Sequence, residues 1–341
     1  MKIKTTAAAF AAAVILLTGC GSAASSSGEN SAAETAKAGT SAADLSGSSA
    51  EPEEESSSPE PEEESSSPEP EEKDMESLQE LITELPPEGY DQDREGVTYP
   101  EFQKLVYYSQ TAERKTKVNV LLPAGYDESR KYPVLYILHG FYDTEDWMAR
   151  KKVALSRILT NLQLDGKAKE MIVVLPYIFC SKELAYTTGM DYENCLAYDN
   201  FINDLETDLI PFIKEKFSVA EGRENTAVTG FSMGGRESLF IGCSHPEQFG
   251  YIGAVCPAPG LAPGQLKPEE LSFAEDVKPY VLLISSSKAD GTVGSNPDTY
   301  RNYFKKNGEP FLTHVMEKTG HDHTSVKPHL YNFMQLLFQD K

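Results

Sequence analysis

One serine in the sequence has neighbours suited to nucleophilic catalysis. Residues 227–238 read AVTGFSMGGRES, in which Gly230, Ser232 and Gly234 form the pattern Gly-x-Ser-x-Gly. An apolar run precedes the motif and a helical pattern follows it, which predicts a tight turn between a buried strand and a helix. Such a turn lifts the serine oxygen above a sheet, and the helix N-terminus directs backbone N–H groups toward a developing oxyanion. A glycine-rich turn with an incidental serine is the alternative interpretation.

The base that a serine nucleophile needs is expected among the histidines near the C-terminus. In a strand–turn–helix arrangement the chain order is nucleophile, acid and histidine. His321 follows Gly320 at the end of a predicted strand, where open α/β sheets carry their functional loops. His323 is the alternative base. His314 lies inside a predicted strand and is interpreted as structural, and His329 precedes the last helix and is interpreted as a surface or capping residue.

The acid of such a site should follow an earlier strand. Asp290 does so, because the apolar run VLLISSSKAD leads directly into it. Asp298 stands near a predicted helix start and is interpreted as a cap, whereas Asp276 precedes the strand. We therefore expect Asp290 to orient His321 and to stabilise its protonated form.

Two backbone donors are expected to form an oxyanion hole. One is the N–H of Met233, the residue after the nucleophile. The other should come from the loop LHGFYDTEDW (138–147), where the N–H of Phe141 is preferred to that of Gly140. His139 in the same loop is interpreted as a structural residue that shapes it.

The elements that must position these residues alternate between strands and helices. This alternation implies the α/β class, with a mostly parallel sheet covered by helices on both faces. Strands are predicted over 117–123, 133–140, 170–176, 225–230, 251–257, 280–286 and 311–320, and helices over 153–166, 199–217, 234–246, 299–308 and 330–339.

The first twenty residues have the features of a bacterial lipoprotein signal. Lys2 and Lys4 precede the apolar run AAAFAAAVILL, which is too short to span a bilayer comfortably. The run ends in LTGC, with small Gly19 before Cys20. We expect export, cleavage before Cys20 and lipid attached to its sulfur, which would anchor the protein to the outside of the cell membrane. An ordinary signal peptide is the alternative.

A long acidic stretch separates this signal from the rest of the chain. Residues 21–75 consist almost wholly of Ser, Ala, Glu and Pro, and EPEEESSSP occurs at 51–59 and again at 60–68. They hold 15 acids and 2 bases, so they account for −13 of the net charge of −22. Such a composition predicts a disordered spacer, and the acidity argues against a nucleic-acid partner. Residues 76–95 are interpreted as a lead-in to a domain over 96–341.

Four cysteines follow Cys20. The sequence holds no Cys-x-x-Cys pair, so a zinc or redox motif is not supported. Cys180 and Cys195 lie in one predicted loop region and could pair in an exported protein. Cys243 and Cys256 are interpreted as buried free thiols.

Residues 97–341 resemble carbohydrate esterase family 1 of the α/β-hydrolase superfamily, especially the feruloyl esterases attached to bacterial xylanases. The segments that carry the resemblance are PAGYDESRKYPVLYILHG, TEDW, DNFINDLETDLIPFIKEKFSVAEGREN, GFSMGG and GHDHTSVKPHLYNF. It implies the α/β-hydrolase fold, Ser232 as nucleophile, Asp290 as acid and His321 as base. It also implies cleavage of feruloyl or acetyl esters on plant cell-wall xylan, as in an acetylxylan or feruloyl esterase, without a cofactor.

One departure from the resembled family concerns the acyl group. Close feruloyl esterases have an aromatic residue and a tryptophan at places that correspond here to His323 and Val326. The contacts with a flat aromatic acyl group are therefore expected to differ from those in close feruloyl esterases. An acyltransferase, an esterase for small non-carbohydrate esters and a non-catalytic binding protein are the alternatives. The presence of all three triad candidates in order argues against the last.

Overall fold

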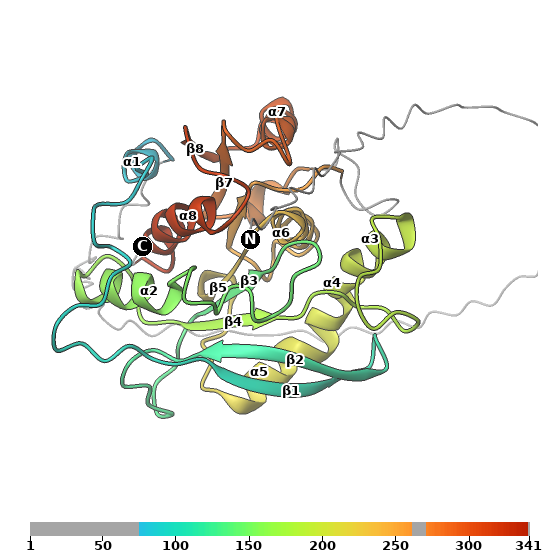
Figure 1. The fold of residues 1–341 in the computed structure, drawn as a ribbon, viewed down its shortest axis with the longest axis horizontal. Coiled ribbons are helices and arrows are strands. Elements are labelled where there is room, and N and C mark those ends of the chain that lie inside the picture. Colours follow the sequence, from blue (N-terminus) through green and yellow to red (C-terminus); the bar gives the residue numbers. More distant parts are fainter. Residues whose placement is uncertain (1–74, 261–270, 340–341) are drawn as a thin grey trace, which may run out of the picture. The chain divides into compact units, whose positions relative to one another are not determined.

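The protein, described as a computed structural model over residues 75–260 and 271–339, is built on a mixed β-sheet (Figure 1). Within these residues eight strands pair in the order β1-β2-β4-β3-β5-β6-β7-β8. The strands are β1 (Gln103–Ser109), β2 (Arg114–Leu121), β3 (Val134–Leu138), β4 (Ile172–Pro176), β5 (Thr226–Gly230), β6 (Tyr251–Val255), β7 (Val281–Ser287) and β8 (Leu312–Met316).

The sheet is parallel from β4 to β8 and antiparallel at the β1–β2 end. Strands β3 to β7 are buried along their whole length apart from the first residue of β5, and their apolar runs suit strands covered on both faces. Within the strand ladder, Leu135 of β3 lies opposite Val173 of β4 and Ala227 of β5. The predicted mostly parallel α/β sheet is therefore confirmed.

Helices cover both faces of the sheet (Figure 1). Val134, Tyr136 and Leu138 of β3 point into a core shared with α4, α5 and α6, whereas Leu135 and Ile137 point into a core shared with α2 and α8. This alternation follows from the two-residue period of a strand. The helices are α1 (Met75–Glu80), α2 (Leu155–Leu164), α3 (Tyr192–Asp199), α4 (Phe201–Asp204), α5 (Ile210–Lys216), α6 (Met233–Ser244), α7 (Asn296–Lys306) and α8 (His323–Leu336), with a π segment at Leu205–Leu209 and short 3₁₀ helices at Arg223–Asn225 and Glu275–Val277.

The lead-in segment belongs to the folded unit. Gln79 of α1 exchanges two hydrogen bonds with the backbone of Thr313, at 2.8 Å each, on the outer edge of β8. The backbone of Thr83 likewise exchanges two bonds with the side-chain amide of Asn332 on α8, at 3.1 and 2.7 Å. The segment thereby covers an open strand edge, which would otherwise be free to pair with another chain.

Several elements of the structure differ from those predicted. The helix predicted over 199–217 is divided by the π segment Leu205–Leu209. Helix α8 begins at His323 rather than at residue 330, because the side chain of Asp322 caps it by accepting from the N–H of Thr324 at 2.8 Å. Strand β1 and helix α3 were not expected.

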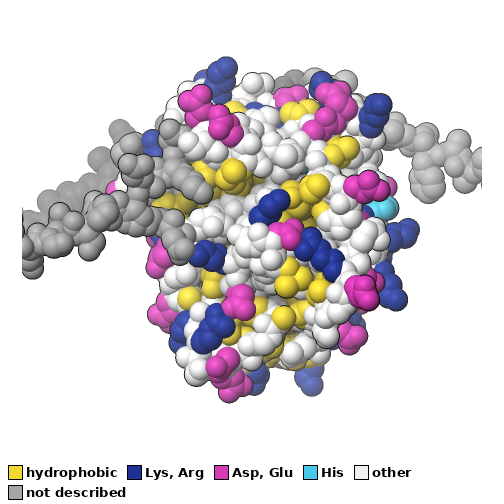
Figure 2. Space-filling model, turned by 90° about the vertical axis from the view of Figure 1, so that its left-hand side faces the viewer, with side chains coloured by type: hydrophobic (Ala, Val, Ile, Leu, Met, Phe, Trp, Pro, Cys, Tyr) yellow, Lys and Arg dark blue, Asp and Glu magenta, His cyan; other side chains and the backbone are white. Residues whose placement is uncertain are grey.

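The surface of the described residues carries charges of both signs. On the face shown in Figure 2, Lys and Arg side chains lie among Asp and Glu side chains, with apolar patches between them. Among the described residues, no helix has the length and apolar composition that a membrane span requires. The predicted signal, Cys20 and the spacer lie outside the described residues, apart from Met75 at the spacer's end.

Candidate active site

Ser232 occupies a strained turn between β5 and α6. Its backbone has φ 55° and ψ −113°, a region that residues other than glycine rarely adopt and that costs about 1–3 kcal/mol. The turn is held because the Ser232 N–H donates to the Val255 carbonyl at 3.0 Å and its own carbonyl accepts from Ala258 at 2.9 Å. The predicted strand–turn–helix setting of the serine is therefore present.

The two glycines of the motif allow the backbones to approach closely. A Cβ added at Gly230 would lie 2.3 Å from the Gly234 carbonyl oxygen, and one at Gly234 would lie 2.3 Å from the Leu138 carbonyl oxygen. Real Cβ atoms do not come so close to backbone oxygens. The start of α6 can therefore rest on the end of β3 only because both positions are glycine.

His321 and Asp290 lie beside Ser232 at the carboxyl edge of the sheet. The Oγ of Ser232 is 2.9 Å from Nε2 of His321, and Nδ1 of His321 is 2.6 Å from Oδ2 of Asp290. Asp290 follows β7, and His321 lies between β8 and α8. The structure thus brings the three predicted residues into one hydrogen-bonded chain, although they are up to 89 positions apart in sequence.

The environment of Asp290 favours its charged form. Its Oδ1 accepts from the N–H groups of Thr292 at 2.9 Å and Val293 at 3.4 Å. Burial opposes ionisation, but the hydrogen bond and charge of His321 together with the Thr292 N–H outweigh it, so the pKa of Asp290 lies below its ordinary value. An ionised Asp290 fixes the proton of His321 on Nδ1, which leaves Nε2 free to accept the proton of Ser232.

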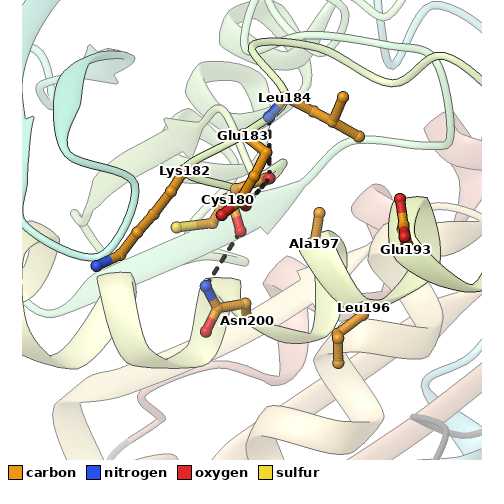
Figure 3. A pocket seen from close by; sticks show the side chains of 9 residues that line it. Cys180, Lys182, Glu183, Leu184, Glu193, Leu196, Ala197 and Asn200 are labelled. Carbon is orange, nitrogen blue, oxygen red and sulfur yellow. Dashed lines mark hydrogen bonds between the residues drawn. The ribbon is translucent and has the colours of Figure 1, made fainter.

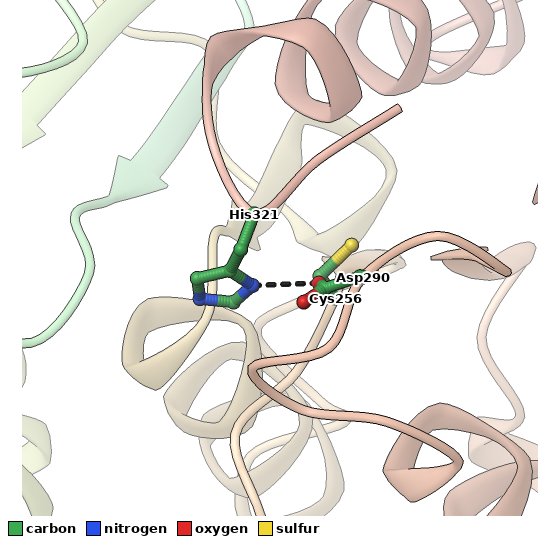
Figure 4. Close-up of side chains that lie close together, drawn as sticks. All are labelled: Cys256, Asp290 and His321. Carbon is green, nitrogen blue, oxygen red and sulfur yellow. Dashed lines mark hydrogen bonds and ion pairs between the residues drawn. The ribbon is translucent and has the colours of Figure 1, made fainter. Parts of the chain in front are cut away.

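Cys256 lies on the far side of Asp290 (Figure 4). Its Sγ, an oxygen of Asp290 and a nitrogen of His321 all lie within 4.8 Å of one another. Burial and the charge of Asp290 raise the pKa of the Cys256 thiol, which therefore stays protonated. These three groups are also metal-ligand types, but the bond between Asp290 and His321 already accounts for their arrangement.

Aromatic rings support the imidazole of His321. The ring centroid of Phe231 lies 4.5 Å from that of His321, and Trp147 stacks on Phe231 with centroids 5.2 Å apart. Nearby Asp143 is half-buried, and this burial raises its pKa to about 6 even though the charges of Arg150 and His321 oppose the shift. Sequence analysis missed all three supporting residues, although Phe231 stands inside the serine motif and Trp147 ends the TEDW segment.

The two predicted oxyanion donors have free backbone N–H groups within the described part of the chain. Met233 is the first residue of α6, where an N–H has no partner inside its helix. Neither its N–H nor that of Phe141 has an acceptor among the described residues. The N–H of the next residue in the loop, Tyr142, is already donated to the hydroxyl of Tyr198 at 3.2 Å.

His139 shapes the oxyanion loop, in line with its structural interpretation. It is buried, its Nδ1 donates to the Gly140 carbonyl at 2.8 Å, and its Nε2 accepts from the Ile178 N–H at 3.1 Å. Burial lowers the pKa of His139 to about 4, so the ring stays neutral and ties the end of β3 to the end of β4.

The interpretation of His329 as a surface or capping residue is wrong. It is fully buried on α8, where its Nε2 meets the Thr229 hydroxyl and its Nδ1 the Ser285 hydroxyl, at 2.7 Å each. Its burial follows from the early start of α8, which places position 329 on the inward face of the helix. His314 is buried beside it, 3.0 Å from the same Ser285 hydroxyl, and is structural as expected.

The alternative base His323 and the neighbouring acid Asp298 make no hydrogen bond to Ser232. His323 begins α8 with a partly exposed side chain, 3.9 Å from Asp322. Asp298 lies in the first turn of α7 and pairs with Arg301 at 2.6 Å rather than capping the helix with its side chain. Neither belongs to the hydrogen-bonded chain of Ser232.

A cavity of about 490 Å³ lies between the loop after β4 and helix α3 (Figure 3). Its lining residues include Cys180, Lys182, Glu193 and Asn200, and none of the Ser232 group. The pairing considered for Cys180 and Cys195 is not formed, since all four cysteines of the described residues are free. Cys180 is buried, with its Sγ 4.0 Å from the hydroxyl of Ser109 on β1.

Comparison with known proteins identifies the family. Residues 109–283, about half of the chain, match the family described as "Putative esterase". The chain belongs to this esterase family. A carbohydrate esterase family 1 (CE1) ferulic acid esterase from Anaeromyces mucronatus is 39% identical with a TM-score of 0.71, over 75% of this chain and 97% of that one. The predicted family, the α/β-hydrolase fold and the assignment as a carboxylic ester hydrolase are confirmed.

More distant relatives extend the comparison. The chain is 29% identical to an endo-1,4-beta-xylanase/feruloyl esterase of Xylanibacter ruminicola over 252 residues, which is 72% of this esterase but only 32% of that protein. It therefore spans about a third of the length of this curated relative. A feruloyl esterase module from Clostridium thermocellum shares the fold, with 18% identity and a TM-score of 0.61 over 75% of this chain and 93% of that one.

Proposed function

We propose that this esterase removes feruloyl or acetyl groups from plant cell-wall xylan through a covalent acyl-enzyme on Ser232. The observation that carries the proposal is the unbroken chain of hydrogen bonds from Ser232 through His321 to Asp290. The substrate class rests on the ferulic acid esterase at 39% identity and on the xylanase/feruloyl esterase relative.

The reaction proceeds in two halves. His321 Nε2 accepts the hydroxyl proton while the Ser232 oxygen attacks the ester carbonyl carbon, and the N–H groups of Phe141 and Met233 stabilise the oxyanion. His321 then returns the proton to the departing sugar oxygen, which leaves an acyl group on Ser232. In the second half, water gives a proton to His321 and attacks the acyl carbon. Ser232 leaves with that proton, and the carboxylic acid is released.

Aromatic side chains on the loop of Phe141 support a feruloyl group as the acyl group. Phe141 packs edge to face on Tyr142 with ring centroids 4.8 Å apart, and the Tyr142 side chain is 55% exposed. A flat aromatic acid gains contact area from such walls, whereas an acetyl group is too small to do so. Val326, which stands where close feruloyl esterases have a tryptophan, is fully buried in the core. It therefore offers no surface to a ligand and does not line the site.

The substrate is tested by comparing feruloylated arabinoxylan, acetylated xylan and a simple aryl acetate at equal enzyme concentration. We expect the highest kcat/KM on the feruloylated polymer, and no release from any substrate by Ser232→Ala. Similar efficiency on all three substrates would contradict a site adapted to a polysaccharide ester. The Ser232→Ala variant tests the catalytic mechanism, and the comparison of the three substrates tests the specificity.

We also propose that the esterase is exported and held at the cell membrane by lipid on Cys20. The LTGC segment and the basic, apolar stretch before it support this location. The acidic spacer would then separate the catalytic domain from the membrane surface. Cys20→Ser should release the protein from the membrane fraction, and unchanged retention would contradict the anchor.

A further inference from the structure

The loop that carries Phe141 contains a tight turn that tyrosine does not favour. The N–H of Asp143 donates to the Gly140 carbonyl at 3.3 Å, so Gly140 to Asp143 form a four-residue turn. Tyr142, at the third position of the turn, has φ 63°. A positive φ at this position is typical of a type II turn, where glycine or asparagine is usual. The turn therefore needs support from outside the loop.

Tyr198 of helix α3 supplies such support. Its hydroxyl accepts the Tyr142 N–H at 3.2 Å, and its ring packs against Phe141 with centroids 4.9 Å apart. The same hydroxyl bonds the Thr187 hydroxyl at 2.7 Å, so it can accept from the Tyr142 N–H while donating to Thr187. A single fully buried side chain thus contacts the Phe141 ring and the N–H of the Phe141–Tyr142 peptide, which directly follows the peptide that carries the Phe141 N–H.

Helix α3 is itself tied to the nucleophile helix. Asp199, the residue after Tyr198, pairs with Arg236 of α6 at 2.7 Å, and both side chains are almost fully buried. Arg236 stands one turn after Met233, the other expected oxyanion donor. This ion pair links the end of α3, which carries Tyr198, to the first turns of α6, which carries the Met233 N–H.

We propose that Tyr198 is a positioning residue, which holds the Phe141 N–H in the orientation that receives the oxyanion. The proposal rests on the proposed acyl-enzyme function. Because the Tyr142 N–H is donated to Tyr198, the Phe141 N–H is the one left for the substrate. Loss of the Tyr198 hydroxyl would remove the hydrogen bond that holds Tyr142 in its strained conformation, and the neighbouring Phe141 N–H would then point to the oxyanion only part of the time.

The test is Tyr198→Phe, which keeps the ring and removes the hydroxyl. On a small aryl acetate we expect kcat to fall about five- to ten-fold with KM nearly unchanged, in proportion to one neutral hydrogen bond. Complete loss of an oxyanion donor lowers kcat about 100- to 1,000-fold, so this is the largest decrease that a misplaced Phe141 N–H could cause. The affinity for an aryl trifluoromethyl ketone, whose adduct with serine carries the oxyanion, should fall by the same factor as kcat/KM.

Two matched variants separate positioning from folding. Thr187→Val removes the other partner of the same hydroxyl and should retain kcat within two-fold. Tyr107→Phe removes a buried tyrosine hydroxyl that bonds Asp204 at 2.5 Å, and it should lower the melting temperature but not kcat. Wild-type kcat in Tyr198→Phe, or unchanged affinity for the ketone, would overturn the positioning role while Ser232→Ala stays inactive. Retained activity in Ser232→Ala would overturn the proposed function as well.

Discussion

Two histidines of this esterase each lie within 3 Å of a hydroxyl group, yet only one is equipped for proton transfer. Nε2 of His321 is 2.9 Å from the Ser232 hydroxyl, and Nε2 of His329 is 2.7 Å from the Thr229 hydroxyl. The second ring nitrogen of His321 meets a carboxylate, whereas that of His329 meets the neutral hydroxyl of Ser285. The partner of the second nitrogen therefore distinguishes the two rings.

Exposure separates the two histidines as well. The His321 side chain is 16% exposed at the edge of the sheet, whereas His329 is fully buried. Burial and the neighbouring His314 hold the pKa of His329 well below its ordinary value, so that ring stays neutral. A close hydroxyl does not make a histidine a base, because the ring also needs a counter-charge and access to substrate.

The largest expected effect is the loss of turnover in Ser232→Ala and His321→Ala. Each should lose several orders of magnitude in kcat on a soluble aryl ester, because nucleophile and base act as one unit. For the same reason, the double variant should be no slower than the single ones. The measurement is kcat for the two single variants and the double variant. In addition, an organophosphate should react with the wild type but not with Ser232→Ala. Effects that multiply in the double variant would contradict a shared role.

Asp290→Asn tests the counter-charge, the feature that His329 lacks. The amide keeps the size of the side chain but removes its charge and can donate to Nδ1, which favours the wrong tautomer of His321. We expect a loss of kcat somewhat smaller than in Ser232→Ala. The measurement is kcat of Asp290→Asn and of wild type on the same soluble aryl ester. A decrease in kcat of less than ten-fold would show that another residue is the acid of the triad.

Much of this site followed from local patterns in the sequence. The glycine spacing located Ser232, and the ends of apolar runs located Asp290 and His321, because parallel strands bring their carboxyl ends to one edge. Tyr198 was not found, since its function depends on contacts with Phe141 and Tyr142 more than fifty positions away. His329 was misassigned because the last helix was predicted to begin at residue 330, whereas Asp322 caps it and it begins at His323.

A substitution at His329 should affect stability and leave chemistry intact. His329→Ala removes the partner of two buried hydroxyls and leaves a cavity, which should lower the free energy of unfolding by about 3 kcal/mol at pH 8. The pKa of His329 is lowered on folding, so its contribution to stability is present above its unfolded pKa, about 6.5. That contribution is lost as the pH falls below this value. Denaturant unfolding at pH 8 and pH 5 should therefore show a smaller difference between variant and wild type at pH 5.

The kcat of His329→Ala on a small ester should stay within a few-fold of wild type, measured where both proteins are folded. His139 remains in both proteins and so cancels in the comparison. A difference in unfolding free energy that is the same at both pH values would show that His329 does not stay neutral in the folded protein.

The smallest expected effect concerns His323 and Asp298, the neighbours that sequence alone could not exclude. Their side chains are directed to Asp322 and Arg301 and take no part in the hydrogen-bonded chain of Ser232. His323→Ala and Asp298→Asn should therefore keep kcat within about two-fold, as substitutions of side chains outside the core and the site usually do. Each has a matched partner in His321→Ala and Asp290→Asn, assayed on the same soluble ester. A fatal His323→Ala beside a mild His321→Ala would reassign the base, and a more damaging Asp298→Asn would reassign the acid, while leaving the esterase class intact.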